Sequence, residues 1–124
     1  MSKTISSNNA PAAVGPYSPA VEAGGLIFVS GQLGLDPQTG ALAPSVEEQA
    51  GQAIYNLEQL LVSAGSGLDK VVKTTLFIKD MRDFGKVNEI YGQFFKQPYP
   101  ARSCVEVARL PKDGLFEIEA IAEK

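Results

Sequence analysis

A long amphipathic stretch between Ser45 and Gly65 leaves few folds open to this chain. Ser45 and Glu48 have the Ser-x-x-Glu spacing of a capping box, which satisfies backbone N–H groups in the first turn of a helix. The apolar residues that follow repeat about every 3.6 residues and therefore share one helix face: Val46, Ala50, Ala53, Ile54, Leu57, Leu60, Leu61 and Ala64. Gly65 then supplies a helix stop. The pattern predicts a helix whose apolar face packs against another layer.

Apolar, β-branched runs on both sides of this helix predict strands. The run Leu26–Val29 lies between glycine-containing pairs, and the run Val71–Ile78 ends at a Lys-Asp pair. Residues 7–20 are rich in Pro, Ala, Gly and Asn, so an irregular surface segment is expected there. Residues 36–40 have the composition of a turn.

A second helix is expected from Asp83, as its N-cap, to about Lys96. Its apolar stripe has helical spacing and consists of Phe84, Val87, Tyr91, Phe94 and Phe95. Asn88 falls on or beside this inward face. Pro98 and Pro100 prevent the helix from continuing.

The last quarter of the chain predicts two strands, at about 102–107 and 115–121, joined by a turn at 111–114. Alternation along the first strand places three side chains on one side, namely Arg102, Cys104 and Glu106. In the second strand, Phe116, Ile118 and Ala120 share one face, and Glu117 and Glu119 share the other.

The order of strands, helix, strand, helix and strands predicts an α+β fold in which two helices cover one face of a sheet. The 124 residues suit one domain, which we expect to span 1–124. The other face of the sheet then needs a partner. In so short a chain, we expect that partner to be another subunit.

Histidine is absent and cysteine occurs once, at Cys104. The lack of histidine removes the commonest general base and metal ligand, and with them the serine–histidine and cysteine–histidine nucleophile pairs. No group of carboxylates around the single thiol has the spacing of a metal site, and no glycine-rich phosphate-binding motif is present. We therefore expect no metal site.

The net charge is −3 and the eleven basic residues are scattered, so no cationic patch is available for nucleic acid. A lone cysteine forms no intramolecular disulfide, which suits a reducing compartment. No stretch approaches the roughly 20 apolar residues of a membrane span, and the N-terminus has no apolar signal core. These features predict a cytoplasmic protein that binds neither nucleic acid nor a membrane.

Arg102 is the most informative charged residue, because it lies in an apolar strand context. Its planar guanidinium matches a carboxylate in a bidentate arrangement. The residue is therefore either paired internally or free to bind a carboxylate ligand. The pattern alone favours a salt bridge to Glu117 or Glu119 on the neighbouring strand, because buried charges are usually paired.

The remaining candidates are each open to two interpretations. Glu117 and Glu119 form either a solvated pair or a general acid/base tuned by burial, and the pattern alone favours the first. Cys104 is more often a small buried apolar residue than a nucleophile. The same choice between a ligand contact and a local structural role applies to Tyr17, Ser30, Gly31 and Asn88.

Taken together, five motifs closely resemble those of the RidA/YjgF family, in the same order and over essentially the whole chain. They are Gly15-Pro16-Tyr17-Ser18, Val29-Ser30-Gly31-Gln32, Val87-Asn88-Glu89-Ile90-Tyr91, the run Pro100–Ala108 and the run Phe116–Ala120. The resemblance implies a chorismate-mutase-like fold with a mixed sheet, a homotrimer with ligand clefts between subunits, and no cofactor. It also implies hydrolysis of reactive 2-enamine/2-imine acids, such as 2-aminoacrylate and 2-iminobutanoate, to 2-keto acids and ammonia.

The resemblance also assigns roles to individual residues. Arg102 matches the arginine that holds the substrate carboxylate, and Glu117 matches the glutamate that orients or activates the attacking water. The positions that line the cleft correspond to Tyr17, Ser30, Gly31, Asn88 and Cys104, with Tyr17 expected from the adjacent subunit. Two departures bear on the shape of the cleft: Phe116 in place of an aliphatic residue, and the short approach Gln97-Pro98-Tyr99.

Two other functions fit parts of the same pattern. One is a trimer that binds and senses a small keto acid without turning it over, although the presence of Arg102 favours an enzyme. The other is an endoribonuclease or translation inhibitor, a label that some relatives carry. The acidic charge and the absence of histidine oppose this second alternative.

Overall fold

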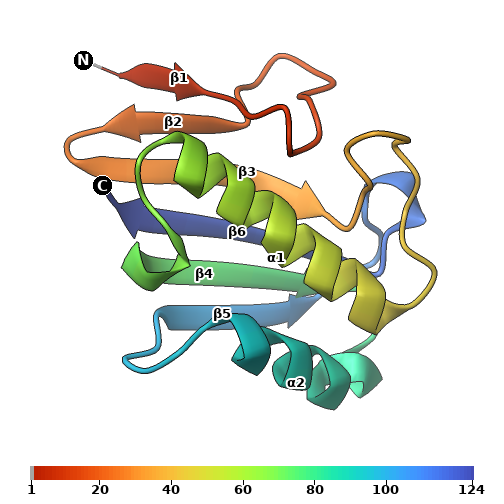
Figure 1. The fold of residues 1–124 in the computed structure, drawn as a ribbon. Helices are drawn as coiled ribbons and strands as arrows, with labels where there is room; N and C mark the ends of the chain where they lie inside the picture. Colours follow the sequence, from red (N-terminus) through yellow and green to blue (C-terminus); the bar gives the residue numbers. More distant parts are fainter. Residues whose placement is uncertain (1) are drawn as a thin grey trace.

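The computed structural model describes residues 2–124, which form a six-stranded mixed sheet with two α-helices (Figure 1). The strands are β1 (Lys3–Ile5), β2 (Ala20–Ala23), β3 (Leu26–Leu33), β4 (Val71–Ile78), β5 (Ala101–Glu106) and β6 (Phe116–Glu123). The helices are α1 (Val46–Ser63) and α2 (Phe84–Phe94), with short 3-10 turns at Leu68–Lys70, Met81–Asp83 and Pro111–Asp113. The α+β class predicted from the sequence is confirmed.

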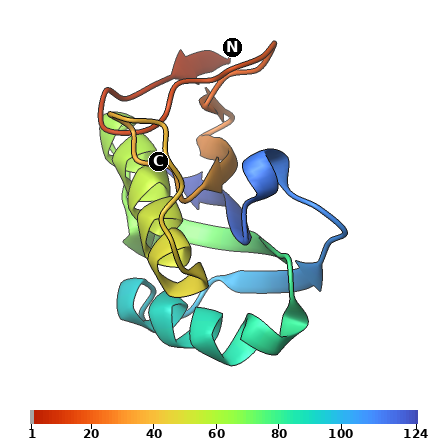
Figure 2. The ribbon, with the colours of Figure 1, turned by 90° about the vertical axis from the view of Figure 1, so that its right-hand side faces the viewer.

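The strand order is β1-β2-β3-β6-β4-β5, in which β4 and β5 are parallel and all other neighbours are antiparallel. Helix α2 connects the parallel pair, which requires a crossover of this kind. Helix α1 lies across β3 and β6 with α2 beside it, and Figure 2 shows the layers from the side. The predicted mixed sheet with both helices on one face is confirmed.

Helix α1 begins and ends where the sequence predicts. The hydroxyl of Ser45 accepts a 3.1 Å hydrogen bond from the backbone N–H of Glu48. At the other end, Gly65 adopts a positive φ of 82°, and the N–H of Ser66 reaches back to the carbonyl of Leu61 at 2.8 Å. This is the Schellman arrangement, in which a left-handed residue turns the chain away from the helix.

The strands differ from the predicted ones in two respects. The sequence predicts neither β1 nor β2, which are short and flank the irregular segment, and it ends β3 too early. In addition, β5 and β6 are not neighbours, because β4 lies between them. Phe116 and Ile118 in β6 are fully buried, which suits a central strand, whereas most of β5 is exposed, which suits an edge. The prediction of adjacent last strands is therefore wrong.

The core lies between the sheet and the helices. It is built from fully buried side chains of α1, β3, β4 and β6, among them Ile27, Leu57, Leu76 and Ile118. No helix within residues 2–124 covers the opposite face of the sheet, where apolar side chains such as Phe28 and Val105 are exposed. None of the helices in the described chain is long and apolar enough to cross a membrane.

Candidate functional site

Arg102 projects from the edge strand β5 toward α2. It is in register with the buried Thr74 of β4, and residues paired in this way share a face of the sheet. Its guanidinium carbon lies 4.8 Å from the centre of the Tyr91 ring and 5.5 Å from that of Phe84. Both distances are within the range of cation–π attraction. The two aromatic rings of α2 therefore hold the cation in a fixed place.

No carboxylate pairs with Arg102 within residues 2–124. The sequence pattern favoured a salt bridge to Glu117 or Glu119, and this prediction is wrong for a geometric reason. Those carboxylates belong to a strand that is not next to β5, and they point to the opposite face of the sheet. The guanidinium donors are consequently available to a ligand.

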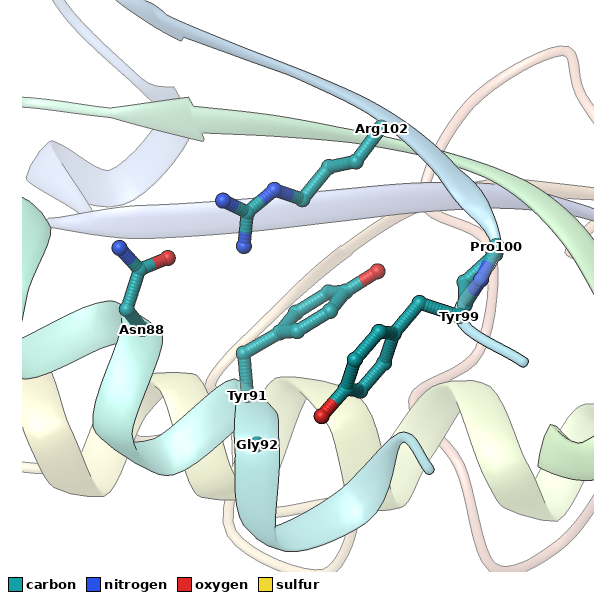
Figure 3. Close-up of a pocket in the computed structure, with 6 residues that line it drawn as sticks. All are labelled: Asn88, Tyr91, Gly92, Tyr99, Pro100 and Arg102. Carbon is teal, nitrogen blue, oxygen red and sulfur yellow. The ribbon is translucent and has the colours of Figure 1, made fainter. Parts of the chain in front are cut away.

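A cavity of about 340 Å³ opens beside this guanidinium (Figure 3). It is lined by Asn88, Tyr91, Gly92, Tyr99, Pro100 and Arg102. Figure 3 shows the amide of Asn88 and the guanidinium of Arg102 directed toward one another above the Tyr91 ring. The Oδ1 atom of Asn88 is buried and has no hydrogen-bond partner in the described residues. The cavity thus combines a free cation, an unsatisfied polar atom and aromatic walls.

Tyr91 forms a rigid platform under the cation. Its hydroxyl shares a 2.8 Å hydrogen bond with that of the buried Thr74, and its ring stacks on Phe95 with centroids 4.4 Å apart. Burial raises the pKa of the Tyr91 hydroxyl, an effect that the Thr74 hydrogen bond and the nearby Arg102 partly oppose. The phenol therefore stays neutral, and its role here is to support Arg102.

Cys104 lies on the same side of β5 as Arg102, as strand alternation predicts. Burial raises the pKa of its thiol, and the positive charge of Arg102 only partly counteracts this. A thiol of raised pKa is largely protonated near neutral pH and is a poor nucleophile. Cys104 is therefore poorly suited to act as a nucleophile.

Glu117 lies with Tyr17 and Gly31 around a second cavity of about 260 Å³. This group occupies the face of the sheet opposite Arg102, because Glu117 alternates with the core residues Phe116 and Ile118. The absence of a Cβ at Gly31 makes room for the carboxylate, since an added Cβ would lie 2.8 Å from the carboxyl carbon of Glu117. Burial, and next the charge of Glu119, raise the pKa of Glu117.

Ser30 holds the segment that leads into this second cavity. Its hydroxyl donates a 2.7 Å hydrogen bond to the carbonyl of Ser18, and the carbonyl of Pro19 accepts a 2.9 Å hydrogen bond from its backbone N–H. These contacts fix the chain next to Tyr17, whose side chain remains half exposed. In this structure, Ser30 therefore has a positioning role.

The structure thus divides the predicted site residues into two groups. Arg102, Asn88 and Cys104 lie on the side of the helices, and Tyr17, Gly31 and Glu117 lie on or beside the other face. The sequence analysis missed Tyr91, Gly92, Tyr99 and Pro100 as cavity residues. Their signals were helical spacing from Asn88 for the first two, and an aromatic residue between two prolines for Tyr99. No group of three or more potential metal ligands occurs in the part of the chain that the structure describes.

The chain is similar to known proteins over its whole length. The family model described as Endoribonuclease L-PSP matches residues 7–124. A 2-iminobutanoate/2-iminopropanoate deaminase of Salmonella typhimurium is 52% identical, with 98% of each chain covered. Two solved structures from Escherichia coli cover 98% of this chain and of their own, each with a TM-score of 0.94. They are the YjgF gene product, which is 48% identical, and TdcF with bound serine, which is 46% identical.

Proposed function

The chain belongs to the RidA/YjgF family, and from this membership we propose that it is a deaminase of small 2-imino acids. The reaction is hydrolysis of 2-iminobutanoate, 2-iminopropanoate and the enamines that tautomerise to them, such as 2-aminoacrylate. The products are the 2-keto acid and ammonia. No cofactor is required, because the imine carbon is itself electrophilic.

The observation that carries this proposal is the unpaired guanidinium of Arg102 at the wall of a cavity. An arginine fork binds a carboxylate through two parallel N–H···O bonds, which fixes both position and orientation. The Salmonella relative bears a name that specifies two 2-imino acids, and TdcF was solved with serine, another small 2-substituted acid. A carboxylate anchored at Arg102 would place the adjacent C2 carbon within the cavity.

Glu117 is the group on this chain best suited to activate water. Its raised pKa makes it a stronger base than an ordinary carboxylate. In the proposed reaction it takes a proton from water as the water oxygen bonds to C2, and passes that proton to the imine nitrogen, which gives a carbinolamine. The same carboxylate then takes the proton of the carbinolamine hydroxyl and passes it to nitrogen, the C2–N bond breaks, ammonia leaves and C2 becomes the keto carbon. No metal or covalent enzyme intermediate is needed.

Arg102 and Glu117 of one chain lie on opposite faces of the sheet and do not meet at a common ligand. We therefore propose that a catalytic cleft forms between two copies, with Arg102, Asn88 and Cys104 from one copy and Tyr17, Gly31 and Glu117 from the next. A closed ring of three copies repeats this heterologous contact three times and leaves no open end. The uncovered apolar face of the sheet supports such a homotrimer. The lone cysteine and the reactive metabolites involved support a cytoplasmic location.

The direct test generates 2-iminobutanoate in the assay and follows the rate of keto-acid formation. The protein is expected to exceed the spontaneous rate, and Arg102→Ala is expected to remove at least about 90% of the added rate, since about 1.4 kcal/mol is tenfold. Arg82→Ala is the matched control, because that arginine is highly exposed and, among residues 2–124, forms a salt bridge with Asp80 alone. A protein that binds keto acids but adds nothing to the spontaneous rate would be a sensor instead.

A mixing experiment tests the shared cleft. Arg102→Ala and Glu117→Ala chains are unfolded, mixed in equal amounts and refolded together. If each cleft draws its two residues from different copies, about a quarter of the clefts contain both native residues. Partial recovery of activity is therefore expected in the mixture but in neither variant alone. No recovery in a mixture that refolds to trimers would assign both residues to one protomer and refute the shared cleft.

A further inference from the structure

The cavity beside Arg102 has a polar end and an apolar end. Arg102 and Asn88 supply the polar end, and the rest of the lining consists of Tyr91, Gly92, Tyr99 and Pro100. If the acid group of a substrate is held by Arg102, as in the proposed function on which this inference rests, part of the molecule faces the apolar end. Pockets that bind small molecules commonly combine a few polar anchors with an apolar wall.

The cavity is larger than the smallest substrates require. A cavity of about 150 Å³ in a protein interior accommodates benzene, which has as many non-hydrogen atoms as 2-iminopropanoate. The cavity here measures about 340 Å³. On this chain's side of the proposed cleft, space therefore remains for a longer apolar side chain after a short imino acid has been placed at Arg102.

Gly92 keeps part of this space open. It lies within α2, where glycine is less favourable than alanine, and its φ is not in the left-handed region. A Cβ at Gly92 would have no other heavy atom within 4 Å, so no packing contact demands a glycine. Gly92 follows Asn88 by four residues and therefore projects from the same helix face. Glycine at this position therefore lowers the stability of the helix, and the absence of a side chain leaves volume open in the cavity.

Tyr99 forms the wall opposite α2. It is 60% exposed, although an aromatic ring of this size usually gains from burial. Pro98 and Pro100 flank it and restrict the backbone, so the ring stays at the mouth of the cavity. In Figure 3 the ring lies beside Tyr91, with its hydroxyl directed away from Arg102 and toward the part of α2 that holds Gly92. The part of Tyr99 nearer Arg102 is thus the apolar ring.

We propose that Gly92 and Tyr99 form a side-chain subsite that lets this enzyme accept imino acids with branched or aromatic apolar side chains. Tyr99 provides the apolar surface that the side chain contacts, and Gly92 provides the room. Both residues determine specificity, whereas Arg102 binds the acid group that all substrates share. The subsite assigns a role to the short Gln97-Pro98-Tyr99 approach, while Phe116 lies wholly in the core and does not line it.

The test compares imines made in the assay by an L-amino-acid oxidase, with catalase present, from alanine, leucine and phenylalanine. The parent protein is expected to hydrolyse all three. Gly92→Leu, which fills the cavity, is expected to lower the ratio of kcat/KM for the leucine-derived imine to that for the alanine-derived imine by about tenfold or more. Tyr99→Ala is expected to lower the same ratio by about threefold to tenfold, because the apolar wall is removed.

Gly85→Leu is the matched control for Gly92→Leu. Gly85 is also in α2, an added Cβ there meets nothing within 4 Å, and it does not line the cavity. This control is expected to leave the ratio unchanged. Circular dichroism and sedimentation check that each variant folds and assembles as the parent does. If leucine at position 92 prevents assembly, Gly92→Ala replaces Gly92→Leu. Its kcat/KM ratio is expected to be lower than that of the parent, by less than for Gly92→Leu.

The outcomes separate this inference from the proposed function. A parent that hydrolyses the alanine-derived imine and leaves the two larger imines at their spontaneous rates refutes the subsite alone. Equal loss for every imine in Gly92→Leu, or an unchanged ratio in both variants, also refutes it. A parent that accelerates no imine refutes the proposed function. In that case, calorimetry measures the affinity of the parent and of Gly92→Leu for 4-methyl-2-oxopentanoate and for pyruvate. Gly92→Leu is expected to weaken binding of the longer acid selectively. Equal weakening of binding for both acids would refute the subsite.

Discussion

The guanidinium carbon of Arg102 lies 4.8 Å from the centre of the Tyr91 ring, with no internal carboxylate to compete for it among residues 2–124. The cation is therefore held by an aromatic face and leaves its N–H donors free. An ion pair would have fixed the side chain equally well, but it would have used the donors that an acid ligand needs.

Replacement of Arg102 by lysine tests whether the fork itself is required. Arg102→Lys keeps the positive charge but loses the two parallel N–H donors and the flat group that stacks on Tyr91. We expect kcat/KM for 2-iminobutanoate to fall by about tenfold to a hundredfold, mostly through a higher KM. Steady-state kinetics measure this, and a lysine variant with the parent KM would show that charge alone suffices.

Removal of the Tyr91 hydroxyl tests the platform beneath Arg102. Tyr91→Phe leaves the fully buried hydroxyl of Thr74 without its 2.8 Å partner, so the free energy of unfolding is expected to fall by about 1–2 kcal/mol. Urea unfolding measures this, and the exposed Tyr55→Phe serves as the control. Thr74→Val added to Tyr91→Phe is expected to recover part of the loss, because no buried hydroxyl is then unpaired. A Tyr91→Phe variant as stable as the parent would contradict the prediction.

Local sequence patterns predicted the elements with strong periodicity. The capping box at Ser45 and the glycine at Gly65 define α1 closely, because both are local hydrogen-bonding devices. Strands β1 and β2 were missed, because runs of three and four residues are too short to show alternation. The central position of β6 was missed as well, since strand order depends on contacts distant in sequence.

The site was predicted in its residues but not in its geometry. Strand alternation correctly placed Phe116 and Glu117 on opposite faces of the sheet, and Arg102 and Cys104 on the same face. It gave no information on which face of the sheet the helices would cover, and so it left Glu117 available as a partner for Arg102. That choice depends on the position of β4 between the last two strands, and only the tertiary structure defines it.

The raised pKa of Glu117 predicts that the free energy of unfolding depends on pH, and that Glu117→Gln changes this dependence. A carboxyl whose pKa is higher in the folded than in the unfolded chain makes the folded state bind more protons between the two pKa values. The free energy of unfolding therefore falls as the pH rises through that window. Glu117→Gln removes this titration, so the variant is expected to be more stable than the parent at neutral pH and to lose that advantage below its ordinary pKa of 4.5.

The measurement is the urea midpoint of both proteins at about pH 4 and about pH 8, at one protein concentration. Glu123→Gln, at the exposed end of β6, is the control and is expected to follow the parent. Deaminase activity of Glu117→Gln is expected to fall by about a hundredfold or more, as for loss of a general base. A variant less stable than the parent at the higher pH would contradict the sign.

The environment of Cys104 predicts that its thiol reacts slowly with disulfide reagents. Because burial raises its pKa, reaction with a disulfide reagent is expected to be slow near neutral pH and to accelerate above pH 9. Cys104→Ser is expected to lower kcat by less than about tenfold, whereas loss of a catalytic nucleophile costs at least about a thousandfold. Stopped-flow thiol titration and steady-state kinetics measure the two effects. A larger loss in Cys104→Ser, rescued by no other small residue, would reopen the nucleophile hypothesis.

Two neighbouring glycines of the β3 region predict opposite outcomes for the same substitution. A Cβ at Gly31 would lie 2.8 Å from the carboxyl carbon of Glu117, which is the movable end of a side chain. A Cβ at Gly34 would lie 2.5 Å from the backbone of Gln49 in α1, which has no freedom to withdraw. Gly31→Ala is therefore expected to displace the carboxylate and lower kcat by about tenfold, with the unfolding midpoint little changed.

Gly34→Ala forces β3 and α1 apart and is expected to cost about 2–4 kcal/mol of stability, or to prevent folding. Thermal and urea unfolding of both variants, with kcat measured on the folded fraction, separate the two effects. Alanine at Gly31 that destabilises the fold as much as alanine at Gly34 would mean that Glu117 is held rigidly by the sheet. Unchanged kcat in a folded Gly31→Ala variant would instead remove the Glu117 carboxylate from the reaction, because its position could then shift without consequence.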